Sequence, residues 1–385
     1  MGFAKKGIYV IVVVAVILFL NYWLSTGIGP YEPPIGPYYF RIVMLIGINV
    51  ILAVSLNLIN GLAGQFSLGH AGFMAVGGYV AAYVTCYLFY GLYGDDAPRA
   101  VLSAGFAASS IVLLGGLFAG AVAAAVAGLV VGIPSLRLKG DYLAIVTLGF
   151  GEIIRVVIQN IDVVGGNTGF RDLTVKPGVV VPVAPLANFF WIFVMAVVTV
   201  VVVRNISTST FGRALTAIRE DEIAAEAMGI NTTYYKVLAF VIGSGFAGIA
   251  GGLSGHLFGN LLTPSTFTFV RSIEVIIMIV LGGIGSITGA VIGATGLTIL
   301  PEFLRKLGLD EAYPGLRMVI YSLTLILLMI FRPQGLLGRR EFGWDWIRKP
   351  SKTKIPVSLT DSKDAIEHTA ARPVDRRSTL GGGDE

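Results

Sequence analysis

The stretch from Val101 to Ile133 reads VLSAGFAASSIVLLGGLFAGAVAAAVAGLVVGI and contains no charged residue. An apolar run longer than about 18 residues can cross the hydrocarbon core of a bilayer as a helix. Over the whole chain, 55% of residues are hydrophobic and 13% are charged, against roughly 25% charged in an average soluble domain. The apolar runs do not alternate as barrel strands do. The sequence therefore predicts an all-α polytopic membrane protein.

Further apolar runs recur along the chain on both sides of this stretch. The predicted spans are Ile8–Leu24, Phe40–Ile59, Ala71–Tyr90, Val101–Ile133, Tyr142–Asn160, Phe189–Arg204, Val237–Phe258, Ile273–Leu304 and Leu316–Phe331. A glycine break at Gly282–Gly285 divides one of them into two short segments. We expect about ten crossings or half-crossings with glycine-broken helices in an internal-repeat-like core.

The distribution of Lys and Arg predicts the orientation of these spans. Basic residues precede the first span, occupy the loop at Arg137–Lys139 and the segment 204–236, and follow the last span. The positive-inside rule places all of these, with both termini, in the cytoplasm. A cleaved signal peptide is the alternative for the first run, but Asn21–Trp23 is more typical of an interfacial anchor than of a cleavage site.

The same pattern divides the chain into three regions. Residues 1–38 form an N-terminal transmembrane helix and an external loop, and residues 39–338 form the transmembrane domain with a cytoplasmic loop at 205–236. Residues 339–385 are polar, with scattered Pro, Ser, Arg and Asp. Such a segment cannot bury a core, so we expect a disordered cytoplasmic tail.

Two glycine-rich stretches resemble each other loosely: NGLAGQFSLGHAGFMAVGG at Asn60–Gly78 and GGIGSITGAVIGATG at Gly282–Gly296. Broken helices can present free backbone groups to a polar solute within the membrane. Close helix packing through small residues is the alternative. We predict a translocation pathway or gate at Asn57, Gln65, Ser67, His70, Gly282, Gly283, Gly285 and Ser286.

Ionisable residues within the apolar runs are costly unless they are paired. Glu152 and Arg155 are three residues apart, as are Arg271 and Glu274, so each couple can form an ion pair on one helix face. We expect both pairs to be structural.

The isolated polar residues offer less specific predictions. His70 and His256 have no second ligand at metal spacing, so we expect structural histidines and no metal site, with a pathway role still open for His70. The segment GGNTG at Gly165–Gly169 is typical of a turn. Alternatively, Asn167 and Thr168 contact an incoming solute or a binding partner.

One segment between the spans is charged and helix-prone: FGRALTAIREDEIAAEAMG at Phe211–Gly229. Leu215, Ile218 and Met228 suggest an amphipathic helix pair or bent helix, and Gly229 is a helix stop. The dipeptide GK occurs nowhere in the sequence, which excludes a P-loop. We therefore predict that the segment docks a soluble subunit that supplies the energy. The candidate coupling residues are Arg213, Arg219, Glu222, Ala224, Ala225, Glu226 and Gly229.

This segment resembles the EAA loop of ABC importer permeases, whose pattern is EAA-x-x-x-G. Ala224, Ala225 and Gly229 fit, whereas Ile223 stands at the acidic position beside Glu222. The flanking segments SLNLINGLAGQFSLGHAGFMAVGGY, PSLRLKGDYLAIVTLGFGEIIR, NTGF, LGGIGSITGAVIGA and FRPQGLL resemble the LivM-type permease of branched-chain amino-acid ABC importers. The resemblance extends from about Asn49 to Leu337.

The resemblance implies a transport subunit of the inner membrane that is not an enzyme. Its partners would be a LivH-like second permease, two cytoplasmic ABC ATPases and an extracytoplasmic solute-binding protein. The chain would bind no cofactor itself, because the ATPases use the ATP to drive alternating access for Leu, Ile and Val. The alternatives are a related permease for urea, amides or other amino acids, and an ion-coupled secondary transporter that would use Glu152 and Glu274.

Overall fold

The computed structural model describes residues 15–17, 19–21, 36–103, 105–135, 140–257, 261–306, 316–331, 335–338 and 341. Residues 15–17 and 19–21 are helical, in agreement with the predicted first span. The rest of Ile8–Leu24, the loop at Arg137–Lys139 and the predicted tail beyond Glu341 lie outside the described residues.

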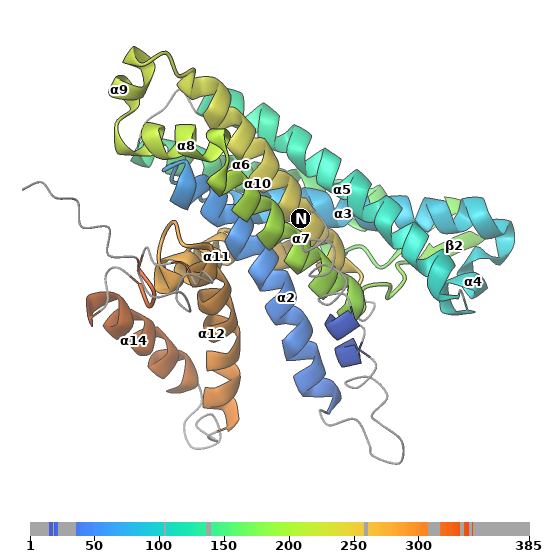
Figure 1. Cartoon of the computed structure of the whole chain (residues 1–385). Coiled ribbons are helices and arrows are strands. Elements are labelled where there is room, and N and C mark those ends of the chain that lie inside the picture. Colours follow the sequence, from blue (N-terminus) through green and yellow to red (C-terminus); the bar gives the residue numbers. More distant parts are fainter. Residues whose placement is uncertain are drawn as a thin grey trace, which may run out of the picture. The chain divides into compact units, whose positions relative to one another are not determined.

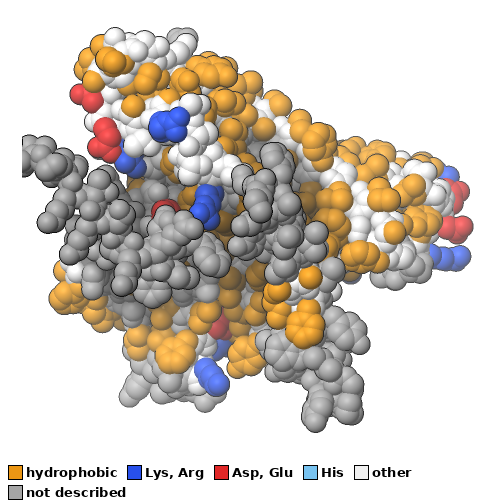
Figure 2. Space-filling model, viewed as in Figure 1, with side chains coloured by type: hydrophobic (Ala, Val, Ile, Leu, Met, Phe, Trp, Pro, Cys, Tyr) orange, Lys and Arg blue, Asp and Glu red, His pale blue; other side chains and the backbone are white. Residues whose placement is uncertain are grey.

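Most of the described chain is helical, and seven of its helices are long and apolar enough to cross a membrane. They are α2 (Pro37–Asn57) with its π-helical continuation η1 (Leu58–Leu62), α3 (His70–Tyr93), α5 (Phe106–Ser135), α6 (Asp141–Gln159), α7 (Phe189–Thr208), α10 (Thr232–Gly255) and α12 (Ile287–Lys306). Apolar side chains cover much of their visible surface (Figure 2). The predicted polytopic all-α fold is confirmed.

Helices α3, α5 and α10 pack closely against one another because their contacts are made by small residues. A Cβ added to Gly248 of α10 would lie 2.7 Å from the carbonyl oxygen of Gly120 in α5, and one added to Gly78 of α3 would lie 3.1 Å from that of Gly251. Close backbone approach of this kind is the usual role of glycine in membrane bundles. The packing interpretation is therefore correct for these glycines.

Helix α2 packs against α7, α10, α11 (Phe269–Gly282) and α12 (Figure 1). Helix α11 has 14 residues, or about 21 Å at 1.5 Å per residue, which is too short for a hydrocarbon core of about 30 Å. It ends at Gly282, and α12 begins at Ile287. The break lies at the predicted glycines, but the prediction of two short segments was wrong for the second, because α12 has 20 residues and is long enough to cross a membrane. Helix α14 (Leu316–Phe331) packs against α12.

The connections at the far end of α3 and α5 contain short elements that the sequence analysis did not predict. They are η2 (Gly94–Asp96), α4 (Ala97–Ser103), η3 (Asp162–Val164), η4 (Gly166–Thr168), the antiparallel strands β1 (Asp172–Lys176) and β2 (Val179–Pro182), and η5 (Pro264–Phe267). Gly178 supplies a positive φ of 88° in the hairpin turn. We call this side of the bundle the hairpin end (Figure 1).

An ion pair fastens the hairpin to the end of α3. Lys176 of β1 pairs with Asp95 of η2, and hydrogen bonding to this carboxylate raises the pKa of Lys176 above its usual value. A backbone bridge between Phe170 and Leu262 joins the same loop to the segment that leads into η5. These contacts hold the loops of the hairpin end together.

Candidate translocation path and coupling loop

The charged segment folds as the predicted helix pair, α8 (Thr210–Glu220) and α9 (Glu222–Ala227). Ser209 caps α8 by accepting from the Gly212 amide. Asp221 ends α8 and caps α9, since its Oδ1 accepts from the amides of Ile223 and Ala224 at 2.9 and 3.0 Å. Gly229 then reverses the chain at a φ of 83°. We call this side of the bundle, opposite the hairpin end, the α8 end (Figure 1).

The two helices bury one apolar face and expose another. Leu215, Ile218 and Ala225 are buried, as an amphipathic pair requires. Met228, expected on the same face, is instead 83% exposed, and Ile223 is 75% exposed. Met228 is the C-terminal cap residue of α9 and lies outside the apolar face that the pair buries.

Two of the predicted coupling carboxylates bind side chains at the start of α10. Glu222 pairs with Lys236 of α10 at 2.5 Å, and Glu226 accepts from the Thr232 hydroxyl at 2.7 Å. They fasten α9 to the start of α10. Arg213, by contrast, is exposed and donates only to the nearby carbonyl of Thr208 in the described contacts.

Arg219 points away from the exposed face and into the bundle. Its Nη1 donates to the carbonyl of Gly61 at 2.8 Å, and its Nη2 donates to Glu220 at 2.7 Å. A Cβ added to Gly64 would lie 2.5 Å from Arg219 Cγ, and one added to Gly285 would lie 3.2 Å from its Nη1. The Arg219 side chain therefore touches both glycine breaks at once.

The two breaks also contact each other directly. Asn57 Oδ1 accepts from the Gly285 amide at 2.8 Å, and Asn57 Nδ2 donates to the Ser286 carbonyl at 3.2 Å. A Cβ added to Gly61 would lie 2.6 Å from the Gly285 nitrogen. The structure thus brings Asn57, Gly285 and Ser286, which are distant in sequence, into one closed contact near the α8 end.

The first break, between η1 and α3, contains buried polar groups. Asn60 Oδ1 accepts from the Ser67 amide, and Ser55 Oγ lies 2.9 Å from His70 Nε2. Both side-chain polar atoms of Gln65, the Ser67 hydroxyl and His70 Nδ1 are buried with no hydrogen-bond partner among the described residues. Such groups are rare in native structures and require a water, a ligand or another conformation to bind them.

A segment that the sequence analysis did not assign to the site covers the second break. The amides of Leu336 and Leu337 donate to the carbonyls of Leu281 and Gly282 at 2.7 and 3.2 Å. A Cβ added to Gly335 would lie 2.6 Å from Gly283 Cα. The FRPQGLL motif was the available signal, because its glycine permits this backbone contact.

Glu341 belongs to the fold although the predicted disordered tail began at residue 339. Its carboxylate accepts from the Ile287 amide at 2.6 Å and from the Thr288 amide and hydroxyl at 3.3 and 3.0 Å. A carboxylate at a helix N-terminus satisfies free amides and favours the helix dipole. The ordered part of the chain therefore reaches the start of α12 through Glu341.

Both predicted ion pairs are present. Glu152 pairs with Arg155 at 2.7 Å, and Arg271 pairs with Glu274 at 2.7 Å. Glu152 Oε1 also accepts from the Phe269 amide, and so holds the start of α11 against α6. Glu152 therefore links the start of α11 to α6.

His256 and the loop residues Asn167 and Thr168 lie outside the contact between the two glycine breaks. His256 lies 2.9 Å from Thr85 Oγ1 and 2.7 Å from the Gly252 carbonyl. Within the described residues, no cluster of His, Cys, Asp or Glu could hold a metal. Thr168 donates to the Gly165 carbonyl as part of the turn, and both it and Asn167 are exposed at the hairpin end.

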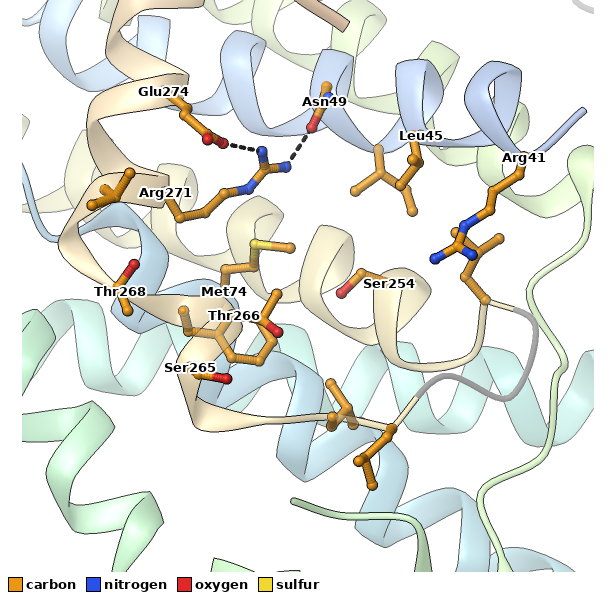
Figure 3. A pocket seen from close by; sticks show the side chains of 16 residues that line it. Arg41, Leu45, Asn49, Met74, Ser254, Ser265, Thr266, Thr268, Arg271 and Glu274 are labelled. Carbon is orange, nitrogen blue, oxygen red and sulfur yellow. Dashed lines mark hydrogen bonds and ion pairs between the residues drawn. The ribbon is translucent and has the colours of Figure 1, made fainter. Parts of the chain in front are cut away.

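A cavity of about 710 Å³ lies between α2, the end of α10, η5 and the first turns of α11. Figure 3 shows Arg41 of α2 and Arg271 of α11 pointing into it, with Met74 and Ser254 between them. Arg271 also donates to Asn49 Oδ1 at 2.5 Å. Residues 41–49 of α2 line this cavity, so it lies on the hairpin-end side of the contact between Asn57 and Gly285.

The family described as branched-chain amino acid transport system / permease component matches residues 38–330. The chain belongs to this family. The permease is 34% identical over 316 residues to the high-affinity branched-chain amino acid transport system permease protein LivM of Salmonella typhimurium, covering 75% of this chain and 68% of that protein.

Two further relatives extend the comparison. The permease is 27% identical over 345 residues to the probable branched-chain amino acid transport permease protein LivM of Methanocaldococcus jannaschii, covering 82% of this chain and 96% of that protein. It is 40% identical over 133 residues to LivH of Escherichia coli, covering 34% of this chain and 41% of that protein. No solved structure matches the chain.

Proposed function

We propose that this chain is the LivM-type permease subunit of an ATP-driven importer of Leu, Ile and Val. One observation carries the mechanism: Arg219 joins the exposed helix pair α8–α9 to both glycine breaks. A partner that moves α8 therefore moves the contact that closes the path. The names of the relatives support the substrate class.

The partners follow from this mechanism. Two ABC ATPases bind α8 and α9 and use the ATP, because the sequence lacks a P-loop. A LivH-like permease forms the other half of the pathway, and a solute-binding protein delivers substrate at the hairpin end, where Asn167 and Thr168 are exposed. The α8 end and both termini are cytoplasmic, which agrees with the basic residues of segment 204–236.

Alternating access is assigned to the two breaks. In the described conformation the hydrogen bond between Asn57 and Gly285 holds the two breaks together near the α8 end. The cavity beside Arg271 lies toward the hairpin end. Movement of α8 would pull the Gly61 carbonyl away from Gly285 and open the path inward. The unpartnered polar groups of Gln65, Ser67 and His70 would then line the open path and contact the polar main-chain groups of the transported amino acid.

An ion-coupled secondary transporter is the alternative from another class. It would need an intramembrane acid free to exchange protons or bind sodium. Glu152 and Glu274, the two candidates, are both engaged by arginines. The ion pairs favour the importer over this alternative, and a related permease for urea or amides remains the other substrate possibility.

Reconstitution with the partners tests the proposal. Proteoliposomes that contain this permease, the LivH-like permease, the ATPases and the binding protein should accumulate radiolabelled leucine only with ATP, and urea should not compete. Uptake that follows a proton or sodium gradient without the ATPases would refute the importer.

The exposed face of α9 should bind the ATPase. Ile223→Asp or Met228→Asp should weaken co-purification of the ATPase by about tenfold, because burying an unpaired charge at an interface costs more than 1.4 kcal/mol. Val163→Asp, which changes a 61% exposed side chain at the hairpin end, is the matched control. Equal recovery of ATPase in all three variants would show that α9 is not the docking surface.

A further inference from the structure

The second glycine break separates α11 from α12, and both interrupted helix ends need partners for their backbone groups. The last carbonyls of a helix and the first amides of the next have no partner within their own helices. The amides of Leu336 and Leu337 donate to the carbonyls of Leu281 and Gly282 at 2.7 and 3.2 Å. The segment after α14 therefore completes the C-terminal end of α11.

A carboxylate beyond the same segment completes the start of α12. Glu341 Oε1 accepts from the Ile287 amide at 2.6 Å, and its Oε2 accepts from the Thr288 amide and hydroxyl at 3.3 and 3.0 Å. The Ser286 hydroxyl adds a second cap, since it accepts from the Gly289 amide at 3.0 Å. We call residues 335–338 together with Glu341 the strap.

Close backbone packing also holds the strap on the break. A Cβ added to Gly335 would lie 2.5 Å from the Gly283 nitrogen, and one added to Gly283 would overlap the Gly338 carbonyl oxygen. These three glycines have positive φ values of 79°, 119° and 58° in the order named, which glycine adopts without strain. The strap thus joins the end of α11 and the start of α12 into one unit.

The first break, between η1 and α3, lacks this completeness. Both side-chain polar atoms of Gln65, the Ser67 hydroxyl and His70 Nδ1 are buried there without a hydrogen-bond partner among the described residues. Among the described residues of the second break, no buried side-chain nitrogen or oxygen lacks a partner. A buried unpaired polar group costs free energy, which is recovered when water enters or the segment moves. The closed conformation is therefore less favourable at the first break than at the second.

We propose that the strap fixes the second break in place, with Glu341 as the positioning residue, and that the path opens by movement of the first break alone. Arg219 touches both breaks, at Gly64 and at Gly285. Movement of α8 against a fixed second break separates the two, whereas an unfixed second break would follow α8 and leave the contact closed. The inference rests on the proposed function, and it adds which break moves and which residue holds the other.

Hydrogen–deuterium exchange of the wild-type complex in lipid nanodiscs tests which break moves. Without nucleotide, amides at residues 63–69 should exchange about tenfold faster than those at residues 283–288 and 335–338, because local opening is easier where fewer groups are satisfied. Addition of ATP, leucine and the binding protein should raise exchange further at residues 63–69 only. Equal exchange at the two breaks without nucleotide would overturn the proposal. A rise at the second break, or at neither break, during leucine uptake would also overturn it.

Glu341→Ala tests the positioning residue. Exchange at residues 286–288 should rise about tenfold and leucine uptake per ATP hydrolysed should fall by a similar factor, because the start of α12 loses its charge-assisted hydrogen bonds. Glu341→Gln keeps an acceptor oxygen for the Ile287 amide and should recover part of both. Glu302→Ala, which removes a carboxylate near the opposite end of α12, is the matched control and should leave exchange at residues 286–288 at the wild-type rate.

The outcomes separate the strap from the function. Wild-type exchange at residues 286–288 in Glu341→Ala, with or without a loss of uptake, would show that this carboxylate does not hold the second break. Absence of ATP-driven leucine uptake in the wild-type complex would instead overturn the proposed function, and the exchange measured without nucleotide would still decide the strap. Thermal unfolding identifies any variant that misfolds, and the wild-type exchange then decides.

Discussion

Arg219→Ala will uncouple the complex: leucine uptake per ATP hydrolysed will fall by one to two orders of magnitude while the ATPases remain bound. The side chain donates to the Gly61 carbonyl at 2.8 Å and packs on Gly64 and Gly285. A hydrogen bond to a charged group contributes about 1.5–3 kcal/mol, and each 1.4 kcal/mol is a factor of ten. The exposed residues of α9 do not depend on this contact, so docking should survive.

Three measurements on one preparation check this expectation: ATPase co-purification, ATP hydrolysis and initial leucine uptake. Arg204→Ala, at the exposed end of α7, removes a similar charge from the same end of the bundle and should change none of them. Arg219→Lys keeps a donor but cannot reproduce the planar guanidinium fork, so intermediate coupling is expected. If Arg219→Ala transports as much leucine per ATP as Arg204→Ala does, α8 is not linked to the breaks through this side chain.

The sequence predicted this site in outline because its signals are local. Apolar runs indicate spans, Gly282–Gly285 indicates a break, and Asp221 and Gly229 mark helix ends at their own positions. The contact between Asn57 and Gly285 could not be predicted in the same way. It joins residues 228 positions apart, and only the packing of α2 against α11 and α12 brings them together.

The missed residues have the same physical explanation. Arg219 was predicted as a coupling residue, but its contact with the Gly61 carbonyl could not be predicted, because it joins residues 158 positions apart. Arg41 sits early in an apolar run and was read only as part of a span. The hairpin had a local signal in Pro177-Gly178 followed by a valine-rich stretch, which the outer-loop interpretation overlooked.

Gly61→Ala should strongly destabilise the closed contact between the two glycine breaks. The new Cβ would lie 2.6 Å from the Gly285 nitrogen and 2.8 Å from its Cα, and both are backbone atoms that cannot rotate away. Overpacking costs about 1–3 kcal/mol. Separation of the breaks also breaks the hydrogen bond from the Gly285 amide to Asn57, and an unpaired buried amide costs about 1–3 kcal/mol more.

The added methyl group raises the free energy of the conformation in which the breaks touch, and it raises that of a conformation with separated breaks much less. Gly61→Ala should therefore lower the unfolding temperature of the purified complex and also shift the remaining folded molecules away from the described state. Leucine uptake should be lost as a result. Gly296→Ala in α12 is the matched control, because a Cβ there meets nothing within 4 Å and alanine favours the helix by about 0.4–1 kcal/mol. If the two alanine variants unfold at the same temperature and transport equally, the breaks do not touch in the working protein, and the closed gate assigned to Asn57, Gly61 and Gly285 must be abandoned.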